Sequence, residues 1–333
     1  MYDVVYLSRV IAKVGFTAAL LCNFLLIYLT GWHTQNITGP YKYMIIFCAL
    51  LGVFFSCTEM VAKPFAHNYN GAFIYFSLTE KVAGWKSIFE VLLAIYAGTY
   101  AALISSITVL FIYRLTILVK PELLPQLFNG WRLSIWIFYI SIFGLIWALL
   151  VYHCGYPNGS SIRYIQGEFE AIYKTSIHDT AVFIVLAYEN NPEPVLQMSS
   201  VACIVGTVSI LVFQYIIMAI CGFQIHFQMN EKLKNFSEVH QRLHRQLFKT
   251  LVIQITVPTI LFHLPVLPIL VTPFLNIEVS LQTGFAYSLF SLYPPIDSLT
   301  IIGVVSEYRI AIKSQCRIKV AYIEKVPVFR AGS

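Results

Sequence analysis

Residues 86–113 form one long apolar stretch, KSIFEVLLAIYAGTYAALISSITVLFIY, in which Lys86 and Glu90 are the charged side chains. A helix needs about 20 mostly apolar residues to cross the hydrocarbon core of a bilayer, so this stretch is long enough to span a membrane. Apolar runs of comparable length lie on both sides of it in the sequence. We therefore predict an all-α membrane protein, a bundle of seven transmembrane helices. The predicted spans are about 10–30, 41–63, 86–113, 132–153, 198–225, 248–272 and 282–304.

The composition of the whole chain agrees with a lipid solvent. Of its 333 residues, 58% are hydrophobic and 11% charged, against about 25% charged in a typical soluble domain. The net charge of +6 does not indicate nucleic-acid binding, because the basic residues lie in short segments between apolar runs. The seven cysteines show no metal-binding spacing, and no hydrolase, metalloprotease or phosphate-loop motif is found. We therefore expect no enzyme activity, no cofactor and no metal site.

The distribution of lysine and arginine predicts the orientation, because these residues concentrate in cytoplasmic loops. If the N-terminus is outside the cell, five basic residues lie in outer segments: Arg9, Lys81, Lys86, Arg163 and Lys174. Fifteen lie in inner segments: Lys42, Arg114, Lys120, Arg132, Lys232, Lys234, Arg242, Arg245, Lys249, Arg309, Lys313, Arg317, Lys319, Lys325 and Arg330. We predict an outer N-terminus, although Arg9 and Lys13 taken alone favour the opposite insertion of the first helix. Residues 1–313 would form the membrane domain and 314–333 a basic cytoplasmic tail that meets anionic lipid.

Polar side chains inside the predicted spans are the candidates for ligand binding, since ionisable groups are costly in lipid. Glu59 and Lys63 are four residues apart on one helical face, where they form either a structural ion pair or a polar wall of a pocket. The same choice between packing and ligand contact applies to the other candidates. The full candidate set is Glu59, Lys63, Glu90, Tyr96, Tyr100, His263 and Tyr287.

A second group of residues is a candidate for conformational switching. Prolines at 258, 265 and 268 prevent the sixth span from being a straight helix and predict a hinge there. Arg114 ends the third span, either as an arginine reaching the membrane interface or as a contact that changes when the bundle opens. The basic segment 227–247 is expected to extend the fifth and sixth helices into the cytoplasm. The candidate set is Tyr113, Arg114, Lys249, Pro258, Pro265, Tyr293, Pro295 and Asp297.

Two sites of covalent modification are predicted from the same orientation. Asn158-Gly-Ser160 lies in the long connection 154–197, which we expect to fold over the outer mouth, and it is a candidate for N-glycosylation. The sequons at Asn36 and Asn235 fall on inner loops and should stay unmodified. Cys316 follows the last span closely enough to be a candidate for palmitoylation.

Three groups of residues resemble one known family over nearly the whole chain. They are Gly39-Pro-Tyr-Lys-Tyr-Met-Ile through Phe55-Ser to Glu59, with His67-Asn-Tyr-Asn; Tyr113-Arg114 with Lys120-Pro121; and Gln246-Leu-Phe-Lys-Thr-Leu-Val-Ile-Gln254 before Pro258, with Tyr293-Pro-Pro-Ile-Asp297. The chain thereby resembles the nematode serpentine chemoreceptors of class r, the Str family, which includes the receptor for the odorant diacetyl.

This resemblance implies a G-protein-coupled receptor, multi-pass in the plasma membrane of sensory cilia, that binds a small odorant or other chemical ligand. It also implies a Gi/o-like G protein as partner, with Arg114 receiving the C-terminal helix of that G protein. Tyr113 stands where rhodopsin-like receptors have an acid, so no acid–arginine lock is expected there. An odorant-gated ion channel of inverted topology and a peptide or pheromone receptor remain as alternatives, the latter because the 154–197 connection is acidic.

Overall fold

The computed structural model of the chain describes residues 2–34, 37, 39–79, 84–190, 194–275, 277 and 279–325. Its helices and strands are α1 (Tyr2–Trp32), α2 (Pro40–Ala62), β1 (Pro64–Tyr69), β2 (Ala72–Ser77), α3 (Lys86–Val119), α4 (Leu124–Phe128), α5 (Leu133–Cys154), α6 (Gly159–Tyr173), β3 (Val182–Leu186), β4 (Tyr188–Asn190), β5 (Pro194–Leu196), α7 (Met198–Lys232), α8 (Glu238–Pro258), α9 (Leu264–Val271), β6 (Ser280–Leu281), α10 (Gly284–Ser288), α11 (Tyr293–Val304) and α12 (Ser306–Lys325). A π-helical turn, Thr259–His263, joins α8 to α9, and a 3₁₀ turn, Leu289–Leu292, joins α10 to α11.

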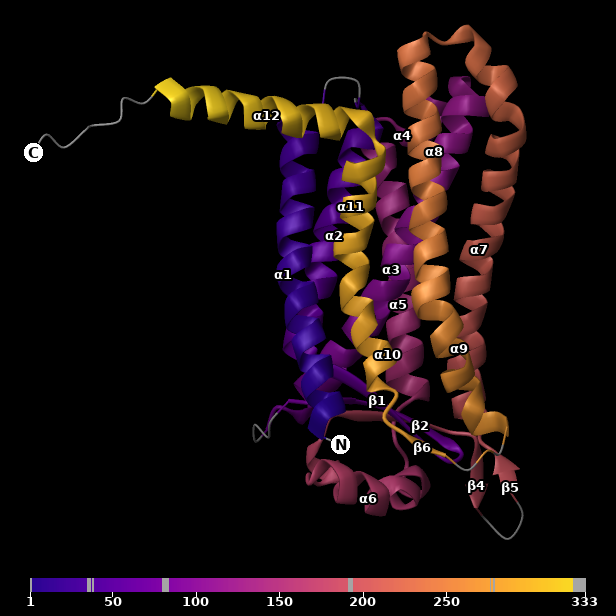
Figure 1. Cartoon of the computed structure of the whole chain (residues 1–333). Helices are drawn as coiled ribbons and strands as arrows, with labels where there is room; N and C mark the ends of the chain where they lie inside the picture. The colour runs from indigo at the N-terminus through magenta and orange to yellow at the C-terminus, as the bar shows by residue number, and fades with distance from the viewer. Residues whose placement is uncertain are drawn as a thin grey trace, which may run out of the picture.

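The long helices form one bundle that matches the predicted spans. In the described part of the chain, six segments are long and apolar enough to cross a membrane: Val4–Trp32, Pro40–Ala62, Lys86–Val119, Gly130–Cys154, Met198–Lys232 and Glu238–Leu275. A seventh, Gly284–Val304, passes the same test together with Ser306–Gln315, from which it is bent by 86°. Figure 1 shows α10 and α11 running along the bundle and α12 turning away from its end. The expected extensions of the fifth and sixth spans are the ends of α7 and α8.

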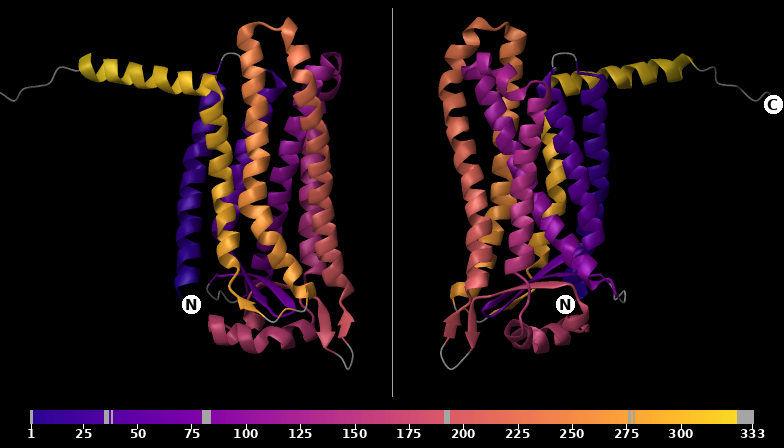
Figure 2. Two further views of the ribbon diagram at one scale, coloured as in Figure 1. Left: turned by 45° about the vertical axis from the view of Figure 1, so that its right-hand side comes forward. Right: turned by 180° about the vertical axis from the view of Figure 1, so that it is seen from behind.

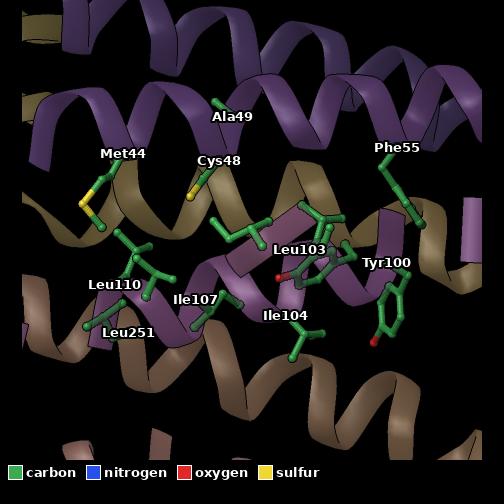
Figure 3. Close-up of a cluster of buried hydrophobic side chains, with 14 of the residues drawn as sticks. Met44, Cys48, Ala49, Phe55, Tyr100, Leu103, Ile104, Ile107, Leu110 and Leu251 are labelled. Carbon is green, nitrogen blue, oxygen red and sulfur yellow. The ribbon is translucent and has the colours of Figure 1, made fainter. Parts of the chain in front are cut away.

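Helix α3 is the centre of the bundle, and it packs against α2, α5 and α7. Its contact with α5 depends on two glycines: a Cβ added to Gly98 would lie 2.5 Å from the carbonyl oxygen of Gly144 and 2.8 Å from the Cβ of Ala148. Small residues spaced four apart allow two membrane helices to approach this closely, because no side chain holds the backbones apart. Figure 3 shows the core on the other side of α3, where apolar side chains of α2, α3 and α8 meet, among them Met44, Leu110 and Leu251.

A four-stranded sheet covers the end of the bundle at which α1 begins, and this end is called the sheet end below (Figure 1). The strand order is β3-β2-β1-β6, with β2 antiparallel to both β1 and β3. Because alternate side chains of a strand point to opposite faces, Phe73 and Tyr75 of β2 belong to the bundle core, whereas Ile74 and Phe76 pack in a second cluster with Phe169 of α6. Both faces of the sheet are therefore buried.

The sheet and α6 were not predicted as such, although the long connection does fold over one mouth of the bundle as expected. It does so as α6, β3, β4 and β5, which lie across the sheet end in both views of Figure 2. The all-α prediction holds for the membrane bundle and misses this cap. The second predicted span is also one residue too long, because α2 ends at Ala62 and Lys63 has a left-handed backbone with φ of 45°.

A buried histidine of β1, His67, links that strand to α6 and β6. The hydroxyl of Tyr173 lies 3.2 Å from Nδ1 of His67, and the hydroxyl of Ser280 lies 3.5 Å from Nε2. Ser280 in turn donates a hydrogen bond of 2.7 Å to the carboxylate of Glu168. Burial lowers the pKa of His67 to about 4, with a smaller opposing effect from Glu168. The imidazole is therefore uncharged at neutral pH and can accept the Tyr173 proton at Nδ1.

Candidate functional site

A cavity of about 680 Å³ lies among the spans in the half of the bundle next to the sheet end. Its sides are formed by residues from α3, α5, α7, the π turn, α9 and α10. The strands β2 and β3 close it toward the sheet end. Its wall is mostly apolar and aromatic, which is typical of sites for small molecules. The wall includes Phe73, Tyr75, Tyr96, Tyr100, Trp147, Phe183, Val185, Cys203, Thr207, Tyr215, Thr259, His263, Tyr287 and Phe290.

A continuous chain of hydrogen bonds crosses one wall of the cavity from α3 to α7 and the sixth span. The Tyr100 hydroxyl lies 2.6 Å from Nε2 of His263, and Nδ1 of the same ring lies 2.8 Å from the Tyr215 hydroxyl. The Tyr215 hydroxyl is also 2.6 Å from Oγ1 of Thr259, which donates to the backbone carbonyl of Ile255 at 2.6 Å. Three helices that are far apart in sequence are thus joined at one imidazole.

The direction of each proton in this chain follows from its last bond. The carbonyl of Ile255 only accepts, so the Thr259 proton points to it and Oγ1 must accept from Tyr215. The Tyr215 oxygen can then accept from His263, which places the ring proton on Nδ1 and leaves Nε2 to accept from Tyr100. A neutral imidazole with one donor and one acceptor satisfies both bonds, so no group in the chain is left unpaired.

The local sequence explains why the sixth span carries this chain. Pro258 lacks a backbone N–H and disturbs the helix that it ends, and the wider π turn Thr259–His263 follows at once. Turns of this kind occur mostly inside α-helices and frequently at functional sites. Thr259 and His263 are the two ends of the turn, and both line the cavity.

Removing the Tyr215 hydroxyl should destabilise the protein more than removing the Tyr100 hydroxyl. Tyr215→Phe deletes two bonds and leaves the His263 N–H unpaired, whereas Tyr100→Phe deletes one bond. We expect the free energy of unfolding to fall by about 2 kcal/mol and about 1 kcal/mol, respectively. Thermal unfolding of the purified protein in lipid nanodiscs measures the difference.

The matched control for this pair is Tyr96→Phe. The Tyr96 side chain also lines the cavity, but its hydroxyl has no hydrogen-bond partner among the described residues. The Tyr96→Phe variant should therefore unfold at the same temperature as the wild type. Equal losses in the Tyr100 and Tyr215 variants would show that the proton order above is wrong.

Four of the seven residues predicted to bind ligand line the cavity, namely Tyr96, Tyr100, His263 and Tyr287. The other three, Glu59, Lys63 and Glu90, are not among its lining residues. Glu59 is buried in α2, and Lys63 is exposed in the turn between α2 and β1. The predicted aromatic residues thus line the cavity, whereas the predicted charged residues do not.

The ion pair between Glu59 and Lys63, one of the two alternatives for these residues, does not form in the structure. Lys63 lies beyond the end of α2 and has a left-handed backbone, so the four-residue helical spacing that would align the two side chains is lost. The described residues contain instead an ion pair between Lys86 and Glu90 in the first turns of α3, with 3.9 Å between nitrogen and oxygen. Both residues belong to α3, so this pair connects only the first turns of that helix, whereas the Lys86 amine also donates to the backbone carbonyl of His178 at 2.8 Å.

Sequence reasoning missed Tyr215 and Thr259, the two hydroxyl groups that complete the chain. Tyr215 follows Gln214 in a long, mostly apolar run, and nothing in the sequence shows which way its ring points. Thr259 had a usable signal, since it directly follows the proline predicted to bend the span. A hydroxyl beside such a proline can satisfy the backbone groups that the proline frees.

At the opposite end of the bundle, Arg114 is buried against an aromatic ring. Its guanidinium carbon lies 3.7 Å from the ring centroid of Tyr41 in α2, and the Tyr41 ring stacks on Tyr113 at 5.4 Å. Tyr113 in turn packs edge-on against Phe128 of α4 at 4.9 Å. Nε and Nη2 of Arg114 have no hydrogen-bond partner among the described residues. A buried cation with unused donors is well suited to receive a carboxylate or carbonyl group.

The other candidate switch residues lie in the sixth and seventh spans between these two ends. Nε2 of Gln254 in α8 donates to the Asp297 carboxylate in α11 at 2.7 Å, which joins the two spans. Tyr293 is buried and its ring packs edge-on against Tyr100 at 6.2 Å, so α11 also contacts the cavity wall. Pro295 is buried in the first turn of α11, whereas Pro265 and Lys249 are exposed.

The sequons at Asn158 and Asn235 lie at opposite ends of the bundle. Asn158 is exposed and begins α6 at the sheet end, where its side-chain oxygen accepts bonds from the Ser161 N–H and the Ser160 hydroxyl, both of 2.8 Å. Asn235 lies at the opposite end, between α7 and α8. Asn36 lies outside the described residues. Cys316 belongs to α12, of which the side chains are described only as far as Gln315.

Comparison with known proteins places these features in a context. The pattern of the family described as "Serpentine type 7TM GPCR chemoreceptor Str" matches residues 8–313. The chain is similar to "G-protein coupled receptor str-33" of Caenorhabditis elegans, with 54% identity over 309 residues, covering 92% of this chain and 90% of the relative. It is also similar to "Serpentine receptor class r-10" of C. elegans, with 26% identity over 301 residues, covering 89% and 87%. The receptor of the same name from Caenorhabditis briggsae is 27% identical over 305 residues, covering 89% and 86%.

Proposed function

The chain belongs to the Str family of serpentine seven-transmembrane, G-protein-coupled chemoreceptors, and we propose a separate role for each of its two candidate sites, the cavity and the end that carries Arg114. The cavity near the sheet end binds a small chemical ligand. The end that carries Arg114 engages the heterotrimeric G protein. The observation that carries this division is the hydrogen-bond chain of Tyr100, His263 and Tyr215, which ties the cavity wall to the bent sixth span.

The coupling between the two sites runs along α3 and the sixth span. Tyr100 and Arg114 lie on α3, about 21 Å apart along its axis. His263 lies in the π turn, and Gln254 of the adjoining α8 binds Asp297 of α11. A ligand that competes for Tyr100 or His263 changes the bend of the sixth span, and α8 then moves relative to α11. In this proposal the movement of α8 uncovers Arg114, which is buried in the structure. The ligand favours the state with Arg114 uncovered by as much as it binds that state more tightly.

The proposed function is tested by a panel of volatile and water-soluble compounds on cells that express the receptor, with calcium and cAMP as readouts. We expect at least one compound to produce a response that disappears without a G protein. A fall in cAMP that pertussis toxin blocks would assign a Gi/o-like G protein, as we propose. A response that persists without any G protein would contradict the proposal.

The remaining parts of the proposal concern location and alternatives. We propose the ciliary membrane of chemosensory neurons as the site of action, which a tagged receptor in the animal would test. Relatives named as G-protein-coupled receptors do not favour the ion-channel alternative. The apolar wall of the cavity supports a small uncharged odorant rather than a peptide. We further propose residues 1–313 as the receptor domain and 314–333 as a cytoplasmic tail.

We propose that the sheet end faces the outside of the cell, and a glycan on Asn158 tests this. If the proposal is correct, glycosidase treatment of the expressed wild-type protein should increase its gel mobility by the mass of one glycan. Ser160→Ala should abolish that change, because it destroys the sequon but keeps the Asn158 cap of α6.

Ser160→Thr is the matched control, since it keeps the sequon and should keep the glycan. A mobility change that persists in Ser160→Ala, or a glycan on Asn235 at the opposite end, would reverse the proposed orientation. The assay is an immunoblot of membranes from cells that glycosylate secreted proteins.

A further inference from the structure

The cavity is closed toward the sheet end by two layers of structure. Phe73 and Tyr75 of β2 and Phe183 and Val185 of β3 form its wall there. The Tyr75 ring stacks on Phe183 at 6.4 Å and packs against Tyr287 at 6.2 Å, so aromatic rings fill the space beneath the sheet. On the other face of the sheet, α6 covers the strands. Every residue of β2 and β3 is buried, so these two strands offer no opening from the sheet end into the cavity.

The cavity lies close to the outer surface of the bundle on the side of α7 and α9. Four of its lining residues are also about half exposed on the surface of the bundle: Val212 (50%) and Ile216 (52%) of α7, and Leu264 (58%) and Leu267 (49%) of α9. Because each of these side chains borders both the cavity and the surroundings, at most one layer of side chains separates the two here. We call these four residues the lateral mouth. Its residues belong to α7 and α9, both of which border the cavity and are labelled in Figure 1.

The position of the lateral mouth along the helices places it in the hydrocarbon core. Val212 and Ile216 are about 21 and 27 Å along α7 from its start at Met198, at 1.5 Å per residue. The hydrocarbon core is about 30 Å thick, and headgroup regions flank it. All four rim residues are aliphatic, as surfaces that face lipid tails are. The mouth therefore opens into lipid rather than into water.

We propose that the ligand enters the cavity from the bilayer through the lateral mouth, and that it is accordingly an uncharged, lipophilic small molecule. Moving a charged group into hydrocarbon is costly, so this route excludes peptides and free ions. Inside, the ligand meets apolar walls and two phenol hydroxyls, of Tyr96 and Tyr287, that have no hydrogen-bond partner among the described residues. These hydroxyls fit an apolar body that carries one or two polar oxygens. That the entering molecule acts as a ligand rests on the proposed function, whereas the route of entry is argued from the structure alone.

Cys203 is a native reporter of access to the cavity. Its free thiol is buried and lines the cavity wall. The receptor in lipid nanodiscs is treated with benzyl methanethiosulfonate, which is uncharged and lipophilic, or with sulfonatoethyl methanethiosulfonate, which carries the same reactive group and a negative charge. Mass spectrometry of the Cys203 peptide gives the rate of modification for each reagent.

The variant that narrows the lateral mouth is Val212→Trp with Leu264→Trp, and Ile216→Trp is a second, single-residue version. Leu149→Trp is the matched control. Leu149 is exposed on α5, and its neighbours two positions away on either side, Trp147 and Val151, line the cavity, so Leu149 points away from it. All these positions face lipid, where tryptophan is tolerated.

The proposal predicts that the benzyl reagent modifies Cys203 in the wild type and in Leu149→Trp at the same rate, and about tenfold more slowly in either narrowed variant. The charged reagent should leave Cys203 unmodified. Equal benzyl rates in narrowed and control variants, modification by the charged reagent at a comparable rate, or no modification by either reagent would overturn the lateral route. Because the assay contains no G protein, failure of G-protein coupling would leave this result unaffected and would count against the proposed function alone.

Discussion

Replacing Arg114 with alanine should abolish ligand-stimulated G-protein activation while leaving the receptor folded at the cell surface. Arg114 is buried on the Tyr41 ring with two guanidinium nitrogens unpaired among the described residues, so its removal costs the resting state little. Loss of a buried charged contact to the G protein would cost about 3 kcal/mol, or roughly a 100-fold loss of coupling. Concentration–response curves for the compound found by the panel, with surface labelling in parallel, measure the effect.

The matched control for this change is Arg132→Ala at the same end of the bundle. Arg132 is partly buried and donates to the backbone carbonyl of Gln126 at 2.8 Å, away from Arg114, so the Arg132→Ala variant should retain the wild-type response. Arg114→Lys separates charge from shape, because lysine keeps the charge but loses the planar fork that stacks on Tyr41. A full response in Arg114→Ala would contradict the role proposed for this residue.

A leucine at Gly98 should prevent the bundle from assembling. A single Cβ at this position would already meet the Gly144 carbonyl oxygen at 2.5 Å and the Ala148 Cβ at 2.8 Å, both on α5. The neighbours are backbone and a short side chain, so neither can move aside without separating α3 from α5. Overpacking of this kind costs about 3 kcal/mol. We expect surface expression to fall below detection and the purified protein, if any, to unfold well below the wild-type temperature.

Gly303→Leu is the matched control for this prediction. Gly303 is also helical, in α11, but a Cβ added there meets no atom within 4 Å. The variant should reach the surface in wild-type amounts, since the added side chain points into lipid. Normal expression of Gly98→Leu would show that α3 and α5 do not cross as closely as described.

The spans could be predicted from sequence because the bilayer itself sets their length and composition. An apolar run of the required length, such as 86–113, has few alternatives to a membrane helix. The cap could not be predicted in the same way, because both faces of β2 are buried and no alternation of polar and apolar residues marks it as a strand. One signal was available: Asn70-Gly71, with φ of 47° at Asn70, joins β1 to β2. That dipeptide is the strongest short-range indication of a hairpin.

The candidate site was predicted only in part, for a physical reason. Sequence spacing identifies which residues share a face of one helix, but the rotation of each helix in the bundle depends on packing. Tyr96, Tyr100 and His263 were chosen because they are polar in apolar runs, and packing turns all three toward the cavity. Glu59 and Lys63 were chosen by the same logic, but the helix ends between them. The hydrogen bond between His263 and Tyr215 depends on α7 lying beside the π turn, and the sequence does not show that arrangement.

The most direct test of the central claim is nucleotide exchange on a purified G protein, with the receptor in lipid nanodiscs and a compound identified by the panel. Val208 lines the cavity, so Val208→Trp fills part of the space that the compound would occupy, while Leu149→Trp leaves it free. We expect the compound to accelerate exchange with the wild type and with Leu149→Trp but not with Val208→Trp. Equal acceleration in all three proteins, or none with the wild type, would contradict it.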